Sequence, residues 1–301
     1  MTHAIIMKRR QFIRATALTP FLAAQMRTVL AEQVNKTFLG SIGLQLYTVR
    51  HQLGKDRKGT LKAIKEMGYV QVEPYEFPKY KAVVVDAKEL GLKVNSTHIQ
   101  WNSVLNPGAA DTPAFAKVLE EAQAAGIKHL IIPTIDPKDR QTLDGYKVAA
   151  EKMNRAAAEA RAAGIQLAYH NHTFEFDPME STRAGFDVLM EEFSADMLFE
   201  VDAFWVQLGK RDPAKLIRSL KGRVTQVHLK DLAAGIKLPE KIEGWWSLPV
   251  EAFASLGDGI IPVNPIIEAA KEAGVQYCHV EQDLSHDPMA SIRRSLGYLR
   301  S

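Results

Sequence analysis

Several short apolar segments of this chain end in ionisable residues. At or just beyond these ends stand Glu73, His98, His170, His172, Glu175, Glu200, Asp202, His228, Lys230, Asp231, Glu281 and Asp283. Carboxylates and imidazoles bind hard or borderline divalent cations, and carboxylates, imidazoles and amines transfer protons. A buried core has no use for such groups, because each costs desolvation free energy unless it is paired. The pattern therefore indicates a site for metal-ion or acid–base chemistry.

The segments that end in these residues have strand character and alternate with helical patterns. The predicted strands are 41–49, 69–75, 92–99, 127–134, 165–172, 197–204, 224–231 and 275–283. The helical patterns at 57–67 and 142–163 each stop at a glycine, Gly68 and Gly164, which tolerates the positive φ of a helix end. Eight strand–helix alternations predict an α/β fold with parallel strands joined by helical crossovers.

The closed (β/α)8 TIM barrel is favoured over an open doubly wound sheet. An open sheet of this size usually has a glycine-rich phosphate loop after its first strand, and YTVRHQLGKD has none. We therefore predict one catalytic barrel domain over residues 37–301. The stretch 232–260, which contains Trp245 and Trp246, is longer than an ordinary connecting loop and is expected to serve function.

Active sites of such barrels lie at the carboxyl ends of the strands, where the polar residues gather. Acidic and histidine side chains from the fifth to eighth strands are expected to meet there around Mn²⁺, Mg²⁺, Co²⁺ or Zn²⁺. Each also has a structural alternative: Glu200 and Asp231 suit salt bridges or caps, and Lys230 suits a pair with Asp231. The single cysteine, Cys278, lies in an apolar run and is expected to be an inert core residue.

The first 36 residues have the layout of an export signal. KRRQFIR is basic, ATALTPFLAA is apolar, and small residues follow, so 1–36 is predicted to be a disordered, twin-arginine-like signal for a periplasmic or secreted protein. A disordered basic tail is the alternative. The apolar run is too short to span a bilayer, so no stable membrane insertion is expected. Without the first 40 residues the net charge is about −2, which argues against a nucleic-acid partner.

From about residue 40 onward the chain resembles the xylose isomerase-like TIM barrel superfamily of sugar phosphate isomerases and epimerases. The resemblance lies in SIGLQLYTVR, AYHNHTFEF, EVDAFWVQLGKRDP, VTQVHLKD, SLGDGIIP and YCHVEQD, in this order. It implies a divalent metal held by Asp202, His228, Glu281 and a fifth-strand acid. His170 stands where many members have that acid, so the fourth ligand is His170 or Glu175. The charge of the set slightly favours Glu175.

The resemblance also implies a reaction, in which a proton is removed beside a sugar carbonyl through an enediolate. Glu281 is the first choice for the base, Glu175 or His170 for the second acid–base group, and Lys230 for the developing oxyanion. The residues expected to bind the substrate are Glu73, His98, His172 and Trp205, with Trp245 and Trp246 as a further apolar wall.

Two other functions stay open at this point. The same site would serve a lyase or dehydratase acting on keto sugars or 3-keto-glycosides, and export favours unphosphorylated substrates of this kind. A non-catalytic periplasmic sugar-binding protein would keep the barrel without the metal. In each case the partner is a small-molecule sugar, and a homo-oligomer is possible.

Overall fold

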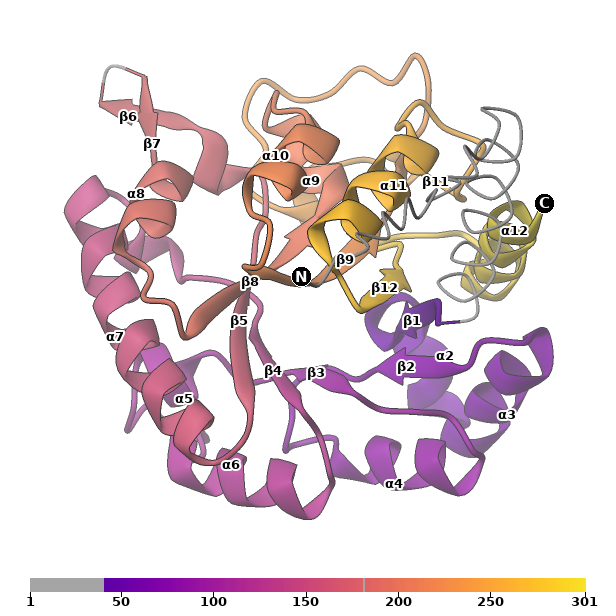
Figure 1. Cartoon of the computed structure of the whole chain (residues 1–301). Helices are drawn as coiled ribbons and strands as arrows, with labels where there is room; N and C mark the ends of the chain where they lie inside the picture. The colour runs from indigo at the N-terminus through magenta and orange to yellow at the C-terminus, as the bar shows by residue number, and fades with distance from the viewer. Residues whose placement is uncertain (1–40, 181) are drawn as a thin grey trace, which may run out of the picture. The chain divides into compact units, whose positions relative to one another are not determined.

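The computed structural model describes residues 41–180 and 182–301, in which parallel strands form a ring with helices around it (Figure 1). The ring consists of β1 (Gly43–Gln45), β2 (Gln71–Glu73), β3 (Ser96–His98), β4 (His129–Ile132), β5 (Gln166–His170), β8 (Met197–Asp202), β9 (Val224–Leu229) and β12 (Tyr277–Val280). Neighbours pair in the order β2-β1-β12-β9-β8-β5-β4-β3. Parallel bridges Gln71↔Lys93 and Phe77↔Ile99 connect β2 with β3. The predicted (β/α)8 barrel is confirmed.

The remaining elements cover the barrel and shape its loops. The helices are α2 (Arg50–Lys55), α3 (Arg57–Met67), α4 (Lys81–Glu89), α5 (Asn102–Leu105), α6 (Phe115–Ala124), α7 (Leu143–Ala162), α8 (Gly185–Glu192), α9 (Ala203–Leu208), α10 (Pro213–Ser219), α11 (Val263–Ala273) and α12 (Pro288–Arg300). Short 3-10 turns are η1 (Leu46–Val49), η2 (Pro137–Asp139), η3 (Phe174–Phe176), η4 (Trp245–Ser247) and η5 (Val250–Ala252). Two small hairpins pair β6 (Pro178–Glu180) with β7 (Arg183–Ala184) and β10 (Asp231–Leu232) with β11 (Phe253–Ala254).

Several helix ends are set by glycines or by a capping hydroxyl. Gly68 and Gly274 close α3 and α11 in the left-handed region, at φ of 104° and 80°. At the other end of a helix, the hydroxyl of Thr142 accepts a hydrogen bond of 3.0 Å from the Gly145 N–H and caps α7. These stops and starts fix where each following strand begins, and so which residues reach the barrel mouth.

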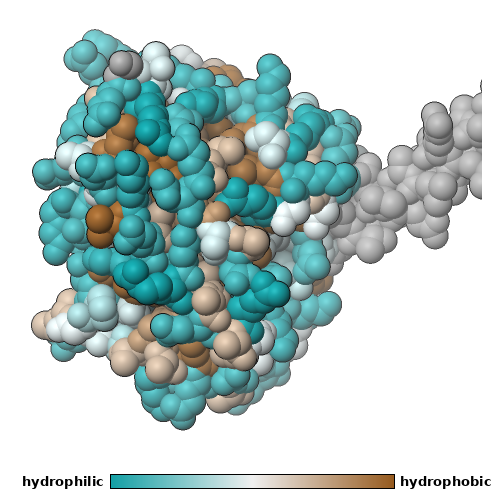
Figure 2. Space-filling view, turned by 60° about the vertical axis from the view of Figure 1, so that its left-hand side comes forward, coloured by the Kyte–Doolittle hydropathy of each residue, from teal (hydrophilic) through white to brown (hydrophobic). Residues whose placement is uncertain are grey.

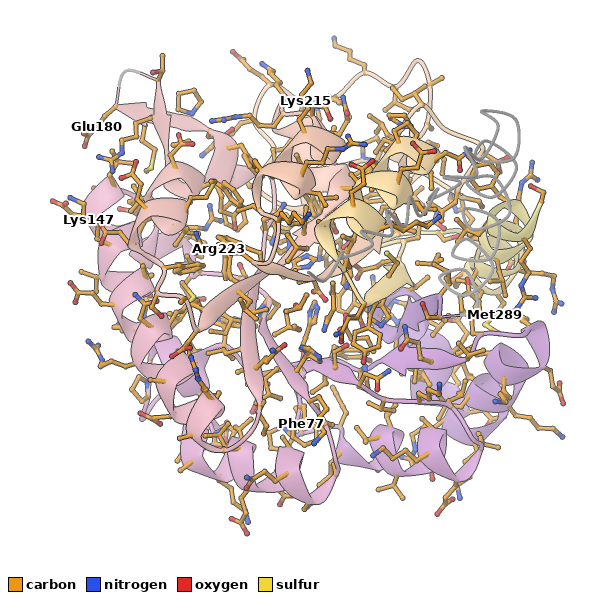
Figure 3. The ribbon with its side chains drawn as sticks, viewed as in Figure 1. Phe77, Lys147, Glu180, Lys215, Arg223 and Met289 are labelled. Atoms are coloured by element: carbon orange, nitrogen blue, oxygen red, sulfur yellow. The ribbon has the colours of Figure 1, made fainter. Side chains whose placement is uncertain are left out.

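Apolar side chains fill the layer between strands and helices, whereas polar ones fill much of the barrel itself. Phe77 is buried, while Lys147 on α7 lies at the outer edge of the helix layer (Figure 3). The helix face turned forward in Figure 2 is mainly hydrophilic. Inside the ring lie Gln45, Glu73, Ser96, Glu200, Gln226 and His228, each 0% exposed. Branched aliphatic side chains are usual at such positions, so this polar interior indicates function.

The sequence predicts an export signal over residues 1–36 and a barrel domain that begins at residue 37. The export signal predicted for 1–36 and the first residues of the predicted domain lie outside the described residues. Among the residues that are described, no helix combines the length and the apolar character needed to cross a membrane.

His129, at the start of β4, makes the stability of the barrel depend on pH. Burial lowers the pKa of its imidazole to about 4, and its Nδ1 has no hydrogen-bond partner among the described residues. Because the folded pKa lies below the unfolded value, this contribution is present above about pH 6.5 and is lost as the pH falls toward 4. Between pH 7 and pH 5, we expect His129 to account for about 2 kcal/mol of lost stability.

Urea unfolding at these two pH values measures this loss. In His129→Phe the difference between pH 7 and pH 5 should shrink by that amount, whereas His286→Phe, an exposed control, should keep the wild-type difference. An unchanged difference in His129→Phe would contradict the assignment.

Candidate active site

Four buried side chains from the ends of four neighbouring strands meet at the mouth of the barrel. His170, Asp202, His228 and Glu281 each offer a ligand atom, and these atoms all lie within 4.8 Å of one another. His228 Nδ1 is 2.7 Å from Glu281 Oε2 and 3.9 Å from Asp202 Oδ2. His170 Nε2 is 3.7 Å from the same Asp202 oxygen. Asp202, His228 and Glu281, expected to converge from the sequence, are thus brought together.

Asp202 shows that this cluster suits a cation. Its Oδ1 caps α9 by accepting hydrogen bonds from the N–H groups of Phe204 and Trp205, at 2.9 and 3.1 Å. Its Oδ2 is buried and has no hydrogen-bond donor in suitable geometry among the described residues, although Lys230 Nζ lies 2.9 Å away. Two imidazole nitrogens and two carboxylate oxygens at this spacing are a donor set that divalent ions of the Mn²⁺, Co²⁺ and Zn²⁺ type accept.

His170, rather than Glu175, is the fifth-strand residue at this cluster. Glu175 lies in η3, and its carboxylate accepts hydrogen bonds from the Tyr169 hydroxyl and, at 2.8 Å, from the His172 N–H. Tyr169 and His170 are adjacent in β5 and point to opposite faces, so Glu175 is held on the outer side of the barrel wall. Burial raises the pKa of Glu175 to about 7. The roles expected of Glu175 as ligand and acid–base group are corrected by this placement.

A second layer of carboxylates lies beneath the cluster and orients its two imidazoles. Glu200 Oε2 lies 3.0 Å from His170 Nδ1 and 2.7 Å from His98 Nε2. Glu73 Oε1 lies 2.8 Å from His228 Nε2. Glu200 thus faces the ring nitrogen of His170 that points away from Asp202. Glu73 faces the ring nitrogen of His228 that points away from Glu281. Carboxylate partners of this kind fix the tautomer and angle of a metal-binding histidine.

Glu200→Gln is therefore expected to weaken Mn²⁺ binding by roughly 10- to 100-fold. The amide keeps the size of the side chain but loses the charge that holds the His170 Nδ1–H. Calorimetric titration of the purified protein with Mn²⁺ measures the affinity without any substrate. Glu272→Gln, which changes a 59% exposed carboxylate, should bind Mn²⁺ like the wild type. Equal affinities in Glu200→Gln and the wild type would show that Glu200 does not position the ligand.

Lys230 supplies positive charge at the edge of the cluster. Its ammonium lies 2.9 Å from Asp202 Oδ2, 2.9 Å from Glu281 Oε2 and 2.7 Å from Asp283 Oδ2, and the residue is 2% exposed. Burial alone would lower the pKa of Lys230, but Asp202 and Asp283 raise it well above the ordinary value. The ammonium therefore stays charged.

The alternative pairing of Lys230 with Asp231 is wrong. The Asp231 carboxylate instead accepts hydrogen bonds from the N–H groups of Leu232, Gly257, Gly259 and Ile261, at 2.9–3.0 Å. Asp231 thereby holds the backbone of residues 232 and 257–261 in place. This agrees with the structural role that the sequence analysis gave it as an alternative.

A cavity of about 340 Å³ opens above the cluster, a size typical of small-molecule sites. Its polar lining includes His98, His170, His172, Lys230, Glu281 and Asp283. Its aromatic lining consists of Tyr47, Tyr75, Trp101, Phe174, Trp245 and Trp246. Arg140 also lines it, with its guanidinium carbon 3.4 Å from the centroid of the Phe174 ring. His170 and Glu281 of the cluster thus line a cavity that is large enough for a small organic molecule.

Comparison with known proteins agrees with this arrangement. The family described as "Xylose isomerase-like TIM barrel" matches residues 61–301. The chain belongs to this family. The resemblance drawn from its sequence motifs is thereby confirmed, and the candidate site lies where the xylose isomerase-like barrels, as TIM barrels, place their chemistry.

Individual relatives in the xylose isomerase-like family are enzymes that act on sugars. An inosose dehydratase of Lacticaseibacillus casei is 28% identical over 202 residues, which are 61% of this chain and 66% of that enzyme, slightly less than two thirds of its length. An inosose dehydratase of Clostridium perfringens is 26% identical over 230 residues, or 69% of this chain and 76% of the enzyme. A solved structure named sugar phosphate isomerase/epimerase, from Parabacteroides distasonis, superposes with a TM-score of 0.70 at 22% identity, covering 86% of this chain and 97% of that one.

Two residues expected to bind substrate lie away from the cavity. Glu73 is 0% exposed and belongs to the layer under the four-residue cluster, so it supports His228 instead of contacting a ligand. Trp205 is also 0% exposed, and its ring packs against Phe204 and Phe253 with centroids 4.9 and 6.5 Å away. Both expectations are corrected. His98 and His172 do line the cavity, as does the pair Trp245 and Trp246.

Other cavity residues were missed by the sequence reasoning. Tyr47 and Tyr75 follow the first two strands, and Trp101 and Arg140 follow the third and fourth. Tyr47, Tyr75 and Trp101 are aromatic and carry neither a metal ligand nor a carboxylate that would mark them as functional. Their position directly after a strand of the barrel was the signal that would have identified them.

Proposed function

We propose that this protein is a divalent-metal-dependent sugar isomerase or epimerase that removes a proton beside a carbonyl group. The observation that carries the proposal is the convergence of His170, Asp202, His228 and Glu281 beside Lys230, at a place where His170, Glu281 and Lys230 line one cavity. These four side chains would hold the metal. When bound, the metal would act as a Lewis acid toward the carbonyl and a neighbouring hydroxyl oxygen of the sugar.

The protein's own residues supply the proton transfers. Glu281 is the base: burial opposes its charge, but Lys230 and His228 hold the pKa of its carboxyl below the ordinary value, so it is ionised and able to accept the proton. The electron pair of the broken C–H bond moves to the carbonyl oxygen, beside which the Lys230 ammonium stabilises the negative charge. Return of the proton from Glu281 to the former carbonyl carbon, together with transfer of the hydroxyl proton from the neighbouring oxygen to the former carbonyl oxygen, completes an isomerisation.

An epimerisation needs a second group that delivers a proton to the other face of the carbon. With Glu175 outside the cavity, His172 is the candidate, because it lines the cavity and its Nδ1 has no hydrogen-bond partner among the described residues. Its ring packs against Phe174 at a centroid distance of 5.3 Å, which restricts its orientation.

Dehydration of a keto sugar is the second candidate function, and the inosose dehydratases among the relatives favour it. The first step is the same deprotonation by Glu281. Instead of reprotonation, the enediolate would expel the β-hydroxyl group as hydroxide, which takes the proton held by Glu281 and leaves as water. Removal of the proton beside the carbonyl is therefore the step common to both reactions.

Incubation of the Mn²⁺-loaded protein in D₂O with inosose and with a set of ketoses, followed by NMR, distinguishes the possibilities. Deuterium at the carbon beside the carbonyl, with a new isomer or epimer, is the expected result. Loss of water would select the dehydratase. Absence of both deuterium and product with every sugar would contradict the proposed chemistry and favour a binding protein.

A further inference from the structure

The outer part of the cavity is lined by four aromatic residues that the proposed chemistry does not use. Tyr47, Tyr75, Trp245 and Trp246 form this outer aromatic wall. Tyr47 contacts Tyr75 edge to face at a centroid distance of 5.4 Å and Trp245 at 6.3 Å, and Trp245 contacts Trp246 at 5.9 Å. The rings come from η1, the loop after β2 and η4, so separate parts of the chain assemble one surface.

Arg50 fixes this wall next to the reacting groups. Its guanidinium carbon lies 4.1 Å from the centroid of the Tyr47 ring and 5.3 Å from that of Trp245. Its Nη1 donates hydrogen bonds to the carbonyl oxygens of Tyr47 and Asp283, at 2.8 and 2.9 Å. The Asp283 side chain in turn binds Lys230. The outer aromatic wall is therefore continuous with the catalytic part of the cavity.

Trp246 is presented to solvent by a loop that is built to hold it there. The residue is 59% exposed, an unfavourable state for so large a side chain. A Cβ on Gly244 would lie 2.4 Å from the indole, so only glycine allows the ring this position. The Ser247 hydroxyl donates to the Gly244 carbonyl at 2.7 Å and accepts from the Glu243 N–H at 3.2 Å, which stabilises the turn. An exposed indole held at a cavity mouth indicates a ligand surface.

The chemistry of the wall fits a hydroxylated ring. A sugar ring has an apolar face of C–H bonds, which packs on aromatic rings, and hydroxyls around its edge, which need polar partners. The wall offers such partners in the tyrosine hydroxyls and in the second oxygen of the Glu76 carboxylate, which also lines the cavity and whose Oε2 pairs with Lys79 at 2.6 Å. Burial raises the pKa of Tyr75 to about 12, so its hydroxyl keeps its proton and can donate. The wall suits an anionic group less well, because its cation, Arg50, already donates to two carbonyl oxygens and packs on two aromatic rings.

We propose that the outer aromatic wall is a subsite for a second sugar ring, and that the substrates are disaccharides or other sugar-linked keto sugars. The identity of the ring that reacts rests on the proposed function, whereas the subsite itself does not. Binding of an unoxidised sugar, which lacks the carbonyl and is not turned over, therefore tests the subsite alone.

Calorimetric titrations of the full chain with glucose, cellobiose, maltose and phenyl β-glucoside make this test. One of the two disaccharides should bind roughly tenfold more tightly than glucose. Trp246→Ala should lower the affinity for that disaccharide by roughly 3- to 10-fold and leave glucose binding within twofold. Ile260→Ala is the matched control, because Ile260 is also 59% exposed but does not line the cavity.

Three results would overturn the subsite. These are equal affinity for glucose and both disaccharides, no effect of Trp246→Ala, or a gain for phenyl β-glucoside that neither disaccharide shares, which would assign the wall to an aryl group. Tighter disaccharide binding without deuterium exchange on any keto sugar would refute the proposed reaction and leave the subsite standing.

Discussion

Replacement of Lys230 by methionine is expected to lower the free energy of unfolding by about 3–5 kcal/mol. The ammonium lies within 2.9 Å of carboxylate oxygens of Asp202, Glu281 and Asp283, all of which are buried. Methionine has a similar length but no charge, so three buried acidic groups would be left with one cationic neighbour fewer. Urea unfolding at pH 7 in the presence of a chelator measures the difference.

Two comparisons sharpen this expectation. Lys147→Met removes a 43% exposed lysine paired with Asp144 and should change stability by less than about 1 kcal/mol. Mn²⁺ should restore part of the stability of Lys230→Met, since a dication at the cluster supplies the missing positive charge. A Lys230→Met protein as stable as the wild type with chelator would mean that the acidic groups do not depend on this lysine.

Glu281→Gln is expected to lower the rate of deuterium exchange into substrate by at least roughly 10³-fold. The amide keeps the shape of the side chain and an oxygen for the metal, but it cannot accept the proton. Exchange rates come from NMR at saturating Mn²⁺, so that weaker metal binding does not enter the comparison. Glu251→Gln, which alters a 61% exposed carboxylate, should retain the wild-type rate. A rate in Glu281→Gln above one tenth of the wild type would exclude Glu281 as the base.

The fold and three members of the metal cluster were predictable because they follow from local rules. Runs such as VTQVHLKD show where a strand ends, and a parallel barrel places all such ends at one mouth. Asp202, His228 and Glu281 each lie at or directly after the end of a strand, so their convergence required no knowledge of the loops. Alternation also predicts that His228 and Lys230 share a face, and both contact Glu281.

The predictions for Glu73, Glu175 and Trp205 were wrong because the backbone that follows each strand determines where these side chains lie. Glu73 ends β2, but the chain continues beside β3 as far as the bridge between Phe77 and Ile99, so Glu73 lies below the mouth. Glu175 is turned toward Tyr169 by the 3-10 turn η3, a conformation that its sequence does not announce. Trp205 falls in the first turn of α9, whose direction is set by packing against Phe253. The pattern of hydrophobic residues predicts which positions are buried. It does not predict in which direction a buried side chain such as Glu73, Glu175 or Trp205 points.

We propose that His170, Asp202, His228 and Glu281 hold one divalent cation at the barrel mouth. A crystal of the protein soaked in Mn²⁺ and measured at the manganese absorption edge tests it most directly. We expect a single anomalous peak within bonding distance of His170 Nε2, His228 Nδ1 and one carboxylate oxygen each of Asp202 and Glu281. A peak bonded to Glu175, or full occupancy of manganese elsewhere with this cluster empty, would contradict it.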